Sequence, residues 1–136
     1  MSKKLQCKVL NDYSVYIVSG KQVRDQHHAD FMGGGHPLAY PFVPKGEIWI
    51  EDIEPVSERQ KILCHEMVEL LLMKHHDMKN HGNGRDYPSA HKIANNVEAK
   101  LREGTKPEEA FGGFIKTYFG NDKELLKLLI SSYNSF

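Results

Sequence analysis

The sequence lacks a net charge and a long apolar run, and each absence excludes a class of protein. Its 18 basic side chains are balanced by 18 acidic ones, whereas proteins that bind nucleic acid through its phosphates usually carry a basic excess or stripe. We therefore expect no nucleic-acid partner. The longest apolar run, at residues 67–73, is interrupted by Glu69 and falls far short of the roughly 20 residues that cross a bilayer. We therefore expect no membrane partner.

Cysteine is also scarce. Only Cys7 and Cys64 occur, far apart and without Cys-x-x-Cys spacing, which argues against a disulfide framework and against a zinc cage of thiolates. We interpret Cys64 as a small core residue. The scarcity is typical of a reducing compartment, and no apolar segment follows Lys3 and Lys4, so we expect no secretory signal and a cytoplasmic location.

The chain has 136 residues, a usual length for one domain with its own core. We predict a single α+β domain, with a small N-terminal antiparallel sheet followed by a helix pair and C-terminal helices. Its three parts are a β-rich part with a long Gly/Pro loop at residues 1–54, the helix pair at 55–104 and a helical extension at 105–136. The sequence implies no particular oligomeric state.

Alternation and β-propensity locate the strands. The expected strands cover residues 6–10, 13–19, 22–24 and 47–51. The first two flank a two-residue turn and so predict a hairpin. Residues 25–46 are rich in Gly, Pro, His and Asp, which indicates a substantial loop.

Capping signals and apolar periodicity locate four helices. The expected helices cover residues 58–75 and 87–103, then one from residue 105 or 106 and one after a cap at 121–124. Ser57 and Gln60 match a capping box, and Pro88 suits a first turn. A polar linker is expected at residues 74–86. We interpret the leucine-rich face of the last helix as part of the core.

Eight histidines raise the question of a metal site. His65 and Glu69 are four residues apart on a predicted helix, so both can reach one ion. Glu66 can then lie beside a water on that ion. This is the geometry of the His-Glu-x-x-His zinc motif with Glu69 in place of the second histidine. Carboxylate oxygen is a normal zinc ligand, although it also makes Mn²⁺ or Fe²⁺ more plausible.

His91 is the leading candidate for a third ligand. Together with Asn95 and Glu98 it lines one edge of the second helix, and this edge faces His65 if the two helices pack antiparallel. Glu98 is either a ligand itself or the acceptor that orients a histidine. His36, which follows three glycines, is a further candidate because a flexible loop can bring it to the site.

Five segments carry a family resemblance. They are Gly34-Gly35-His36, Tyr40-Pro-Phe-Val-Pro44, Glu47-Ile-Trp-Ile-Glu51, Leu63-Cys-His65-Glu66-Met-Val-Glu69 and Tyr87-x-x-Ala-His91. Together they resemble a group of small, uncharacterised phage and prokaryotic proteins of the zincin-like metallopeptidase type, over residues 14–103. The resemblance implies a minimal zincin-like fold in which His65, Glu69 and His91 hold the metal and Glu66 is the catalytic carboxylate.

The function expected from these features is a zinc-dependent hydrolase acting on a peptide or protein. Glu66 is expected to act as general base, and Tyr40, Tyr87 or His36 to stabilise the oxyanion. We also expect an extended peptide to pair with the edge of the strand at residues 47–51.

Three alternatives stay open. Glu66 or Glu98 can close the coordination of the ion, which makes the site structural rather than catalytic. The chain can be a phage-type interaction protein that uses its C-terminal helices. His65 and Glu69 can also belong to the wet side of their helix, together with Glu58 and Lys61. A di-iron protein is disfavoured because paired Glu-x-x-His motifs are absent.

Overall fold

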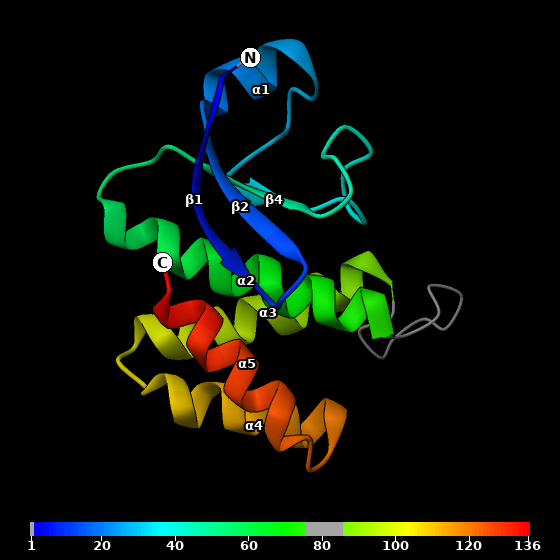
Figure 1. The fold of residues 1–136 in the computed structure, drawn as a ribbon, viewed down its shortest axis with the longest axis vertical. Helices are drawn as coiled ribbons and strands as arrows, with labels where there is room; N and C mark the ends of the chain where they lie inside the picture. Colours follow the sequence, from blue (N-terminus) through cyan, green and yellow to red (C-terminus); the bar gives the residue numbers. More distant parts are fainter. Residues whose placement is uncertain (1, 76–85) are drawn as a thin grey trace.

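The structure is a computed structural model that describes residues 2–75 and 86–136, and within them it contains a four-stranded sheet and five helices (Figure 1). The strands are β1 (Lys3–Val9), β2 (Tyr13–Val18), β3 (Gly34–Gly35) and β4 (Glu47–Glu51). The helices are α1 (Gly20–Gln26), α2 (Val56–His75), α3 (Tyr87–Arg102), α4 (Pro107–Phe119) and α5 (Lys123–Asn134). The predicted α+β class is confirmed. Most of the predicted polar linker, with His76 and His81, lies outside the described residues.

The sheet has the strand order β1-β2-β4-β3 and mixes both pairing directions. The predicted hairpin is confirmed, since β1 and β2 pair antiparallel around a turn in which Leu10 and Asn11 take φ values of 52° and 65°. However, β4 runs parallel to β2, so the expectation of an antiparallel sheet is wrong. Parallel neighbours need a crossover connection, and α1 with the long loop after it provides that crossover.

Helix α1 replaces the strand predicted at residues 22–24. The Ser19 side chain accepts a hydrogen bond from the Gln22 backbone N–H at 3.2 Å and caps the helix. Arg24 then binds the Glu51 carboxylate at 3.1 and 3.2 Å and the Phe31 carbonyl at 3.0 Å. Helix α1 is thereby fastened to the end of β4 and to the long loop.

The long loop between α1 and β4 is held by aromatic packing. Its side chains form a small second core with β2, α1 and β4, made of Val18, Val23, Phe31, Val43 and Trp49 with Tyr16, Tyr40 and Phe42 against it. A Cβ on Gly35 would lie 2.5 Å from Tyr40 Cδ2, so only glycine allows the β3 backbone to pack this closely against the Tyr40 ring. This packing holds the loop in place and so positions His36, the residue directly after β3.

Helix α2 lies at the centre of the larger core, between the sheet and α3 (Figure 1). Its residues from Leu63 to Met73 are all buried, Cys64 among them as predicted. The helix begins at Val56, so Ser57 lies inside the first turn and the predicted capping box is wrong. No described helix is both long enough and apolar enough to cross a bilayer.

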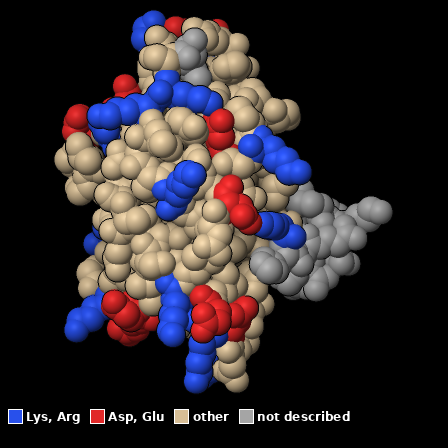
Figure 2. Space-filling view, viewed as in Figure 1, with Lys and Arg blue, Asp and Glu red and all other residues tan. Residues whose placement is uncertain are grey.

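Helices α4 and α5 complete the same core. From α5, the Ser132 hydroxyl accepts a hydrogen bond from the Leu10 N–H at 2.9 Å, and Tyr133 contacts the Gln60 and Lys61 side chains of α2. On the face shown in Figure 2, basic and acidic side chains are interspersed, which agrees with their equal numbers in the sequence. The C-terminal segment therefore packs against both the β1–β2 hairpin and α2.

Truncating Leu129 tests whether α5 belongs to the core. Its side chain is fully buried, so Leu129→Ala is expected to lower the free energy of unfolding by about 2–5 kcal/mol, measured by urea denaturation. The matched control is Leu5→Ala, because Leu5 is 52% exposed and surface changes usually stay within about 0.5 kcal/mol. Equal, small effects of both variants would show that α5 is only an appendage.

Candidate metal centre

The site lies between α2 and α3. Glu58 contacts Arg102, His65 contacts Glu98 and Glu69 contacts His91. Residue numbers that rise on one helix while they fall on the other show that the two helices pack antiparallel. The edge of α3 that carries His91 and Glu98 therefore faces α2, as the sequence analysis required.

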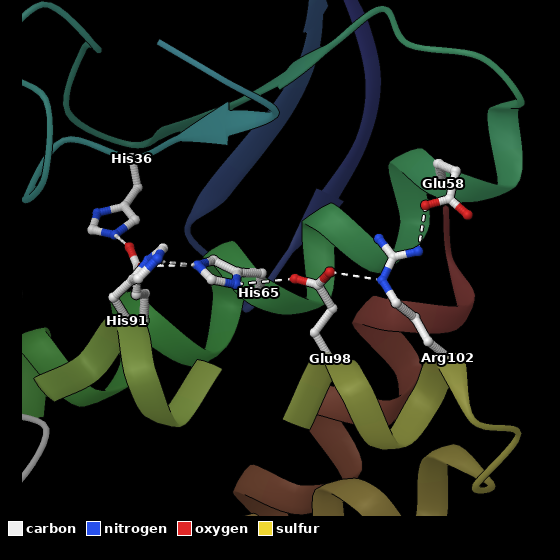
Figure 3. Close-up of polar contacts among 7 residues, drawn as sticks. His36, Glu58, His65, His91, Glu98 and Arg102 are labelled. Atoms are coloured by element: carbon white, nitrogen blue, oxygen red, sulfur yellow. Dashed lines mark hydrogen bonds and ion pairs between the residues drawn. The ribbon is translucent and has the colours of Figure 1, made fainter. Parts of the chain in front are cut away.

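Three atoms with metal-ligand chemistry converge there (Figure 3). His65 Nε2 lies 2.7 Å from Glu69 Oε2, His91 Nδ1 lies 2.8 Å from the same oxygen, and the two nitrogens are 3.1 Å apart. His65 and Glu69 are 7% and 2% exposed, so the interpretation of this arc as a wet helix face is wrong. The structure thus brings together all three residues of the expected metal set.

The distances fit a zinc ion with small adjustments. Zinc bonds of 2.0–2.1 Å at tetrahedral angles place the ligand atoms about 3.3 Å apart. Starting from 2.7–3.1 Å, the three atoms need to separate by about 0.2–0.6 Å to hold an ion of this bond length. The largest separation is needed between His65 Nε2 and Glu69 Oε2, which are 2.7 Å apart on α2, and a small side-chain rotation provides it. The His91 side chain is 44% exposed and can adjust to the other two.

The hydrogen bonds of His65 favour a positive charge between His65 Nε2 and the Glu69 carboxylate. His65 Nδ1 donates to Glu98 Oε1 at 3.1 Å, so in a neutral imidazole Nε2 carries a lone pair that points at the Glu69 carboxylate. Burial lowers the pKa of His65, but the hydrogen bonds with Glu69 and Glu98 outweigh it and raise the pKa to about 10. A metal ion can supply the charge that a proton otherwise supplies.

The sequence left two roles open for Glu98, metal ligand or acceptor that orients a histidine, and its position fits the second. It contacts the Nδ1 side of the His65 ring, away from Nε2, so it is not placed with the three converging atoms. Its other oxygen accepts from Arg102 Nε at 2.8 Å, and Arg102 also pairs with Glu58. Sequence analysis missed Arg102, although its position four residues after Glu98 is a recognisable helix pair.

Removing Glu98 is expected to weaken metal binding. Outer-shell partners of a metal-binding histidine typically contribute 10–100-fold, so Glu98→Ala should raise the Kd for zinc by about 10–100-fold. Competition with a fluorescent chelator measures this change. The matched control is Glu103→Ala, since Glu103 is exposed just after α3. An unchanged Kd in Glu98→Ala would mean that the Glu98–His65 hydrogen bond does not support the ion.

His36 lies behind the converging atoms. It is fully buried and its Nε2 lies 2.9 Å from Glu69 Oε1, which fixes the carboxylate from the side opposite His65. It does not line the cavity, so the oxyanion role expected for His36 is not supported by its position. In the sequence, the preceding glycine run and the resemblance of Gly34-Gly35-His36 pointed to this residue, but neither predicted its contact with Glu69.

Glu66 lies beside Glu69 and faces a cavity of about 150 Å³. The lining residues are Met32, Gly33, Gly34, Tyr40, Ile62, His65, Glu66, Glu69, Tyr87, His91, Asn95 and Glu98. Burial, together with the negative charge of Glu69, raises the pKa of Glu66 to about 8. A carboxylate with a pKa near neutral and access to a cavity has the properties of a general base.

Two tyrosines border the same cavity. Tyr87 stacks on His91 with ring centroids 5.5 Å apart, and Tyr40 lies on the loop side. Burial raises the pKa of both phenols, that of Tyr87 to about 12, with the carboxylates Glu66 and Glu69 adding to the effect. Both hydroxyls therefore keep their protons and can donate hydrogen bonds.

The strand edge expected to accept a peptide is closed. β4 pairs with β2 along one side and with β3 along the other, where Gly34 and Gly35 oppose Ile50 and Trp49. The expectation that a peptide pairs with residues 47–51 is therefore wrong for this part of the strand. Gly33 and Gly34 border the cavity in place of β4.

Comparisons with known proteins give this site no identity. No protein-family model, no curated protein and no solved structure matches the chain. A function therefore has to be inferred from the residues of the site themselves.

Proposed function

We propose that this chain is a small metal-dependent hydrolase, a zinc metallopeptidase acting on a peptide or protein substrate. The supporting observation is the convergence of His65 Nε2, Glu69 Oε2 and His91 Nδ1 beside a cavity that Glu66 also faces. Three protein ligands are the usual number in a catalytic zinc site. Because one of them is a carboxylate, Mn²⁺ or Fe²⁺ are the next candidates.

In this proposal His65, Glu69 and His91 hold the metal ion, and Glu66 transfers the proton. When bound, a zinc ion lowers the pKa of a coordinated water toward ~7 and polarises a carbonyl. Glu66 takes a proton from the attacking water and passes it to the leaving amine. Burial and the charge of Glu69 raise the pKa of Glu66 to about 8. A nearby cation lowers this pKa again, so Glu66 can both accept and release a proton near neutral pH.

The remaining cavity residues hold the substrate. Tyr40 and Tyr87 keep their protons and offer hydroxyl groups to the oxygen that becomes negative during attack on the carbonyl. Among the described residues that line the cavity none is Lys or Arg. We therefore assign oxyanion stabilisation to one of the two phenols.

A structural metal site is the second candidate. It is favoured by the position of Glu66, whose buried carboxylate is close enough to Glu69 and His36 for the three to share an ion. Glu66 would then close the coordination and metal would support folding instead of turnover.

The test uses protein purified without a histidine tag. We expect it to contain metal, to cleave members of a quenched fluorescent peptide library, to lose cleavage with a chelator and to regain it with zinc. Bound metal without any cleavage, together with unfolding by the chelator, would favour the structural site. Absence of metal after incubation with excess zinc would contradict both candidates.

A further inference from the structure

Glu69 uses its two carboxylate oxygens toward two different sets of residues. Oε2 lies within 2.8 Å of His65 Nε2 and His91 Nδ1, whereas Oε1 lies 2.9 Å from His36 Nε2. His36, Glu66 and Glu69 form a second group whose ligand atoms all lie within 4.8 Å of one another. The two groups share only Glu69, so each oxygen can serve its own ion.

The second group is buried and contains two carboxyl groups beside a histidine. His36, Glu66 and Glu69 are 0%, 6% and 2% exposed. No Lys or Arg lies among the described residues that line the cavity beside Glu66, so no permanently charged side chain offsets its carboxylate. Burial of an unpaired carboxylate is costly, and a divalent cation beside Glu66 removes that cost.

We propose that His36, Glu66 and Glu69 Oε1 form a second, weaker divalent-cation site, and that an ion bound there inhibits hydrolysis. This inference rests on the proposed function. Zinc binds histidine nitrogen and carboxylate oxygen at about 2.0–2.2 Å, so atoms 2.9 Å apart, such as His36 Nε2 and Glu69 Oε1, can share one ion. The bridging carboxylate of Glu69 then holds two ions about 3.5–4 Å apart.

Two features make the second ion bind more weakly than the first. Two divalent ions at this distance repel each other, which lowers the second affinity by at least about tenfold. Coordination through His36 Nε2 also moves the ring proton to Nδ1, which is buried and has no hydrogen-bond partner among the described residues. The second site therefore fills only as metal concentration rises.

An ion in the second site would bind to Glu66, which is the proposed general base. Once Glu66 ligates an ion, its oxygen lone pair no longer accepts a proton from the attacking water. The catalytic site keeps its first ion and its shape but loses the proton acceptor. Hydrolysis is therefore expected to rise with the first equivalent of zinc and to fall as the second binds.

The test counts bound ions. Untagged full-length protein is dialysed against buffered zinc of increasing free concentration, and bound zinc is measured by elemental analysis. We expect a first ion per chain and then a second, with peptide cleavage falling as the second binds. His36→Gln keeps an amide N–H for Glu69 but loses the ring nitrogen ligand, so it should stop at one ion and no longer be inhibited. His28→Gln, which changes an exposed histidine, should behave like the wild type.

A second readout locates the extra ion. With Mn²⁺ as the probe, two ions bridged by Glu69 should give an exchange-coupled electron paramagnetic resonance spectrum, which an ion bound to a distant surface histidine does not. Wild-type protein that stops at one ion, or His36→Gln that still binds two coupled ions, would overturn this inference and leave the proposed function intact. Wild-type protein that binds no ion would contradict both.

Discussion

Replacing Glu66 by glutamine is expected to lower kcat for peptide cleavage by about 10²–10⁴-fold, the usual contribution of a general base. Glutamine has nearly the shape of glutamate, so the cavity beside Glu69 keeps its form. The amide cannot accept a proton from the attacking water. Because the group His65, Glu69 and His91 could hold an ion without Glu66, the variant should retain one zinc ion per chain.

The comparison needs activity and metal content from the same preparation. Glu54→Gln is the control, since the Glu54 side chain is 75% exposed and lies outside the cavity. It should cleave at the wild-type rate. Full activity in Glu66→Gln would exclude Glu66 as the base. Metal lost from Glu66→Gln would make Glu66 a ligand and favour the structural alternative.

Removing His91 is expected to abolish tight metal binding. An inner ligand should matter more than the outer-shell partners that contribute 10–100-fold, so His91→Ala should raise the Kd for zinc by more than about 100-fold. The His91 side chain is 44% exposed, so its truncation removes a ligand at little cost in packing. His65→Ala should have the same effect on metal, but it also opens a gap in the buried face of α2.

Thermal unfolding with and without zinc measures this loss. Zinc at 100 times its wild-type Kd should stabilise the wild type by about 2.7 kcal/mol and His91→Ala by no more than about 0.4 kcal/mol, so the Tm of the variant should hardly rise. The control His28→Ala, at an exposed histidine, should keep the full zinc-dependent rise in Tm. A normal rise in His91→Ala would remove His91 from the metal set.

The candidate ligand set could be predicted from the sequence because helix geometry is regular. Spacing by four residues places His65 and Glu69 on one face whatever the rest of the fold does. A step of four and then a step of three, through Asn95, align His91 with Glu98 in the same way. The burial of His65 and Glu69, however, could not be predicted from the sequence. Every residue from Leu63 to Met73 is buried, so α2 has no solvent-exposed side there and periodicity could not show which face meets α3.

The parts that sequence analysis missed depend on long-range pairing. The segment at residues 22–24 carries a strand-like valine, but the Ser19 cap and the Arg24–Glu51 ion pair favour a helix. That helix makes the crossover that turns β4 parallel to β2. The position of His36 depends in turn on the β3–β4 pairing and on aromatic packing around the loop, which no local pattern encodes.

Anomalous X-ray scattering at the zinc absorption edge tests the central claim most directly. Crystals of the untagged protein grown with about one equivalent of zinc should show a strong anomalous peak about 2.0–2.2 Å from His65 Nε2, a Glu69 carboxylate oxygen and His91 Nδ1. The density should also show Glu98 still accepting from His65 Nδ1. No peak at this position in zinc-soaked crystals, with the three side chains hydrogen-bonded to one another, would contradict the metal site and the hydrolase proposed from it.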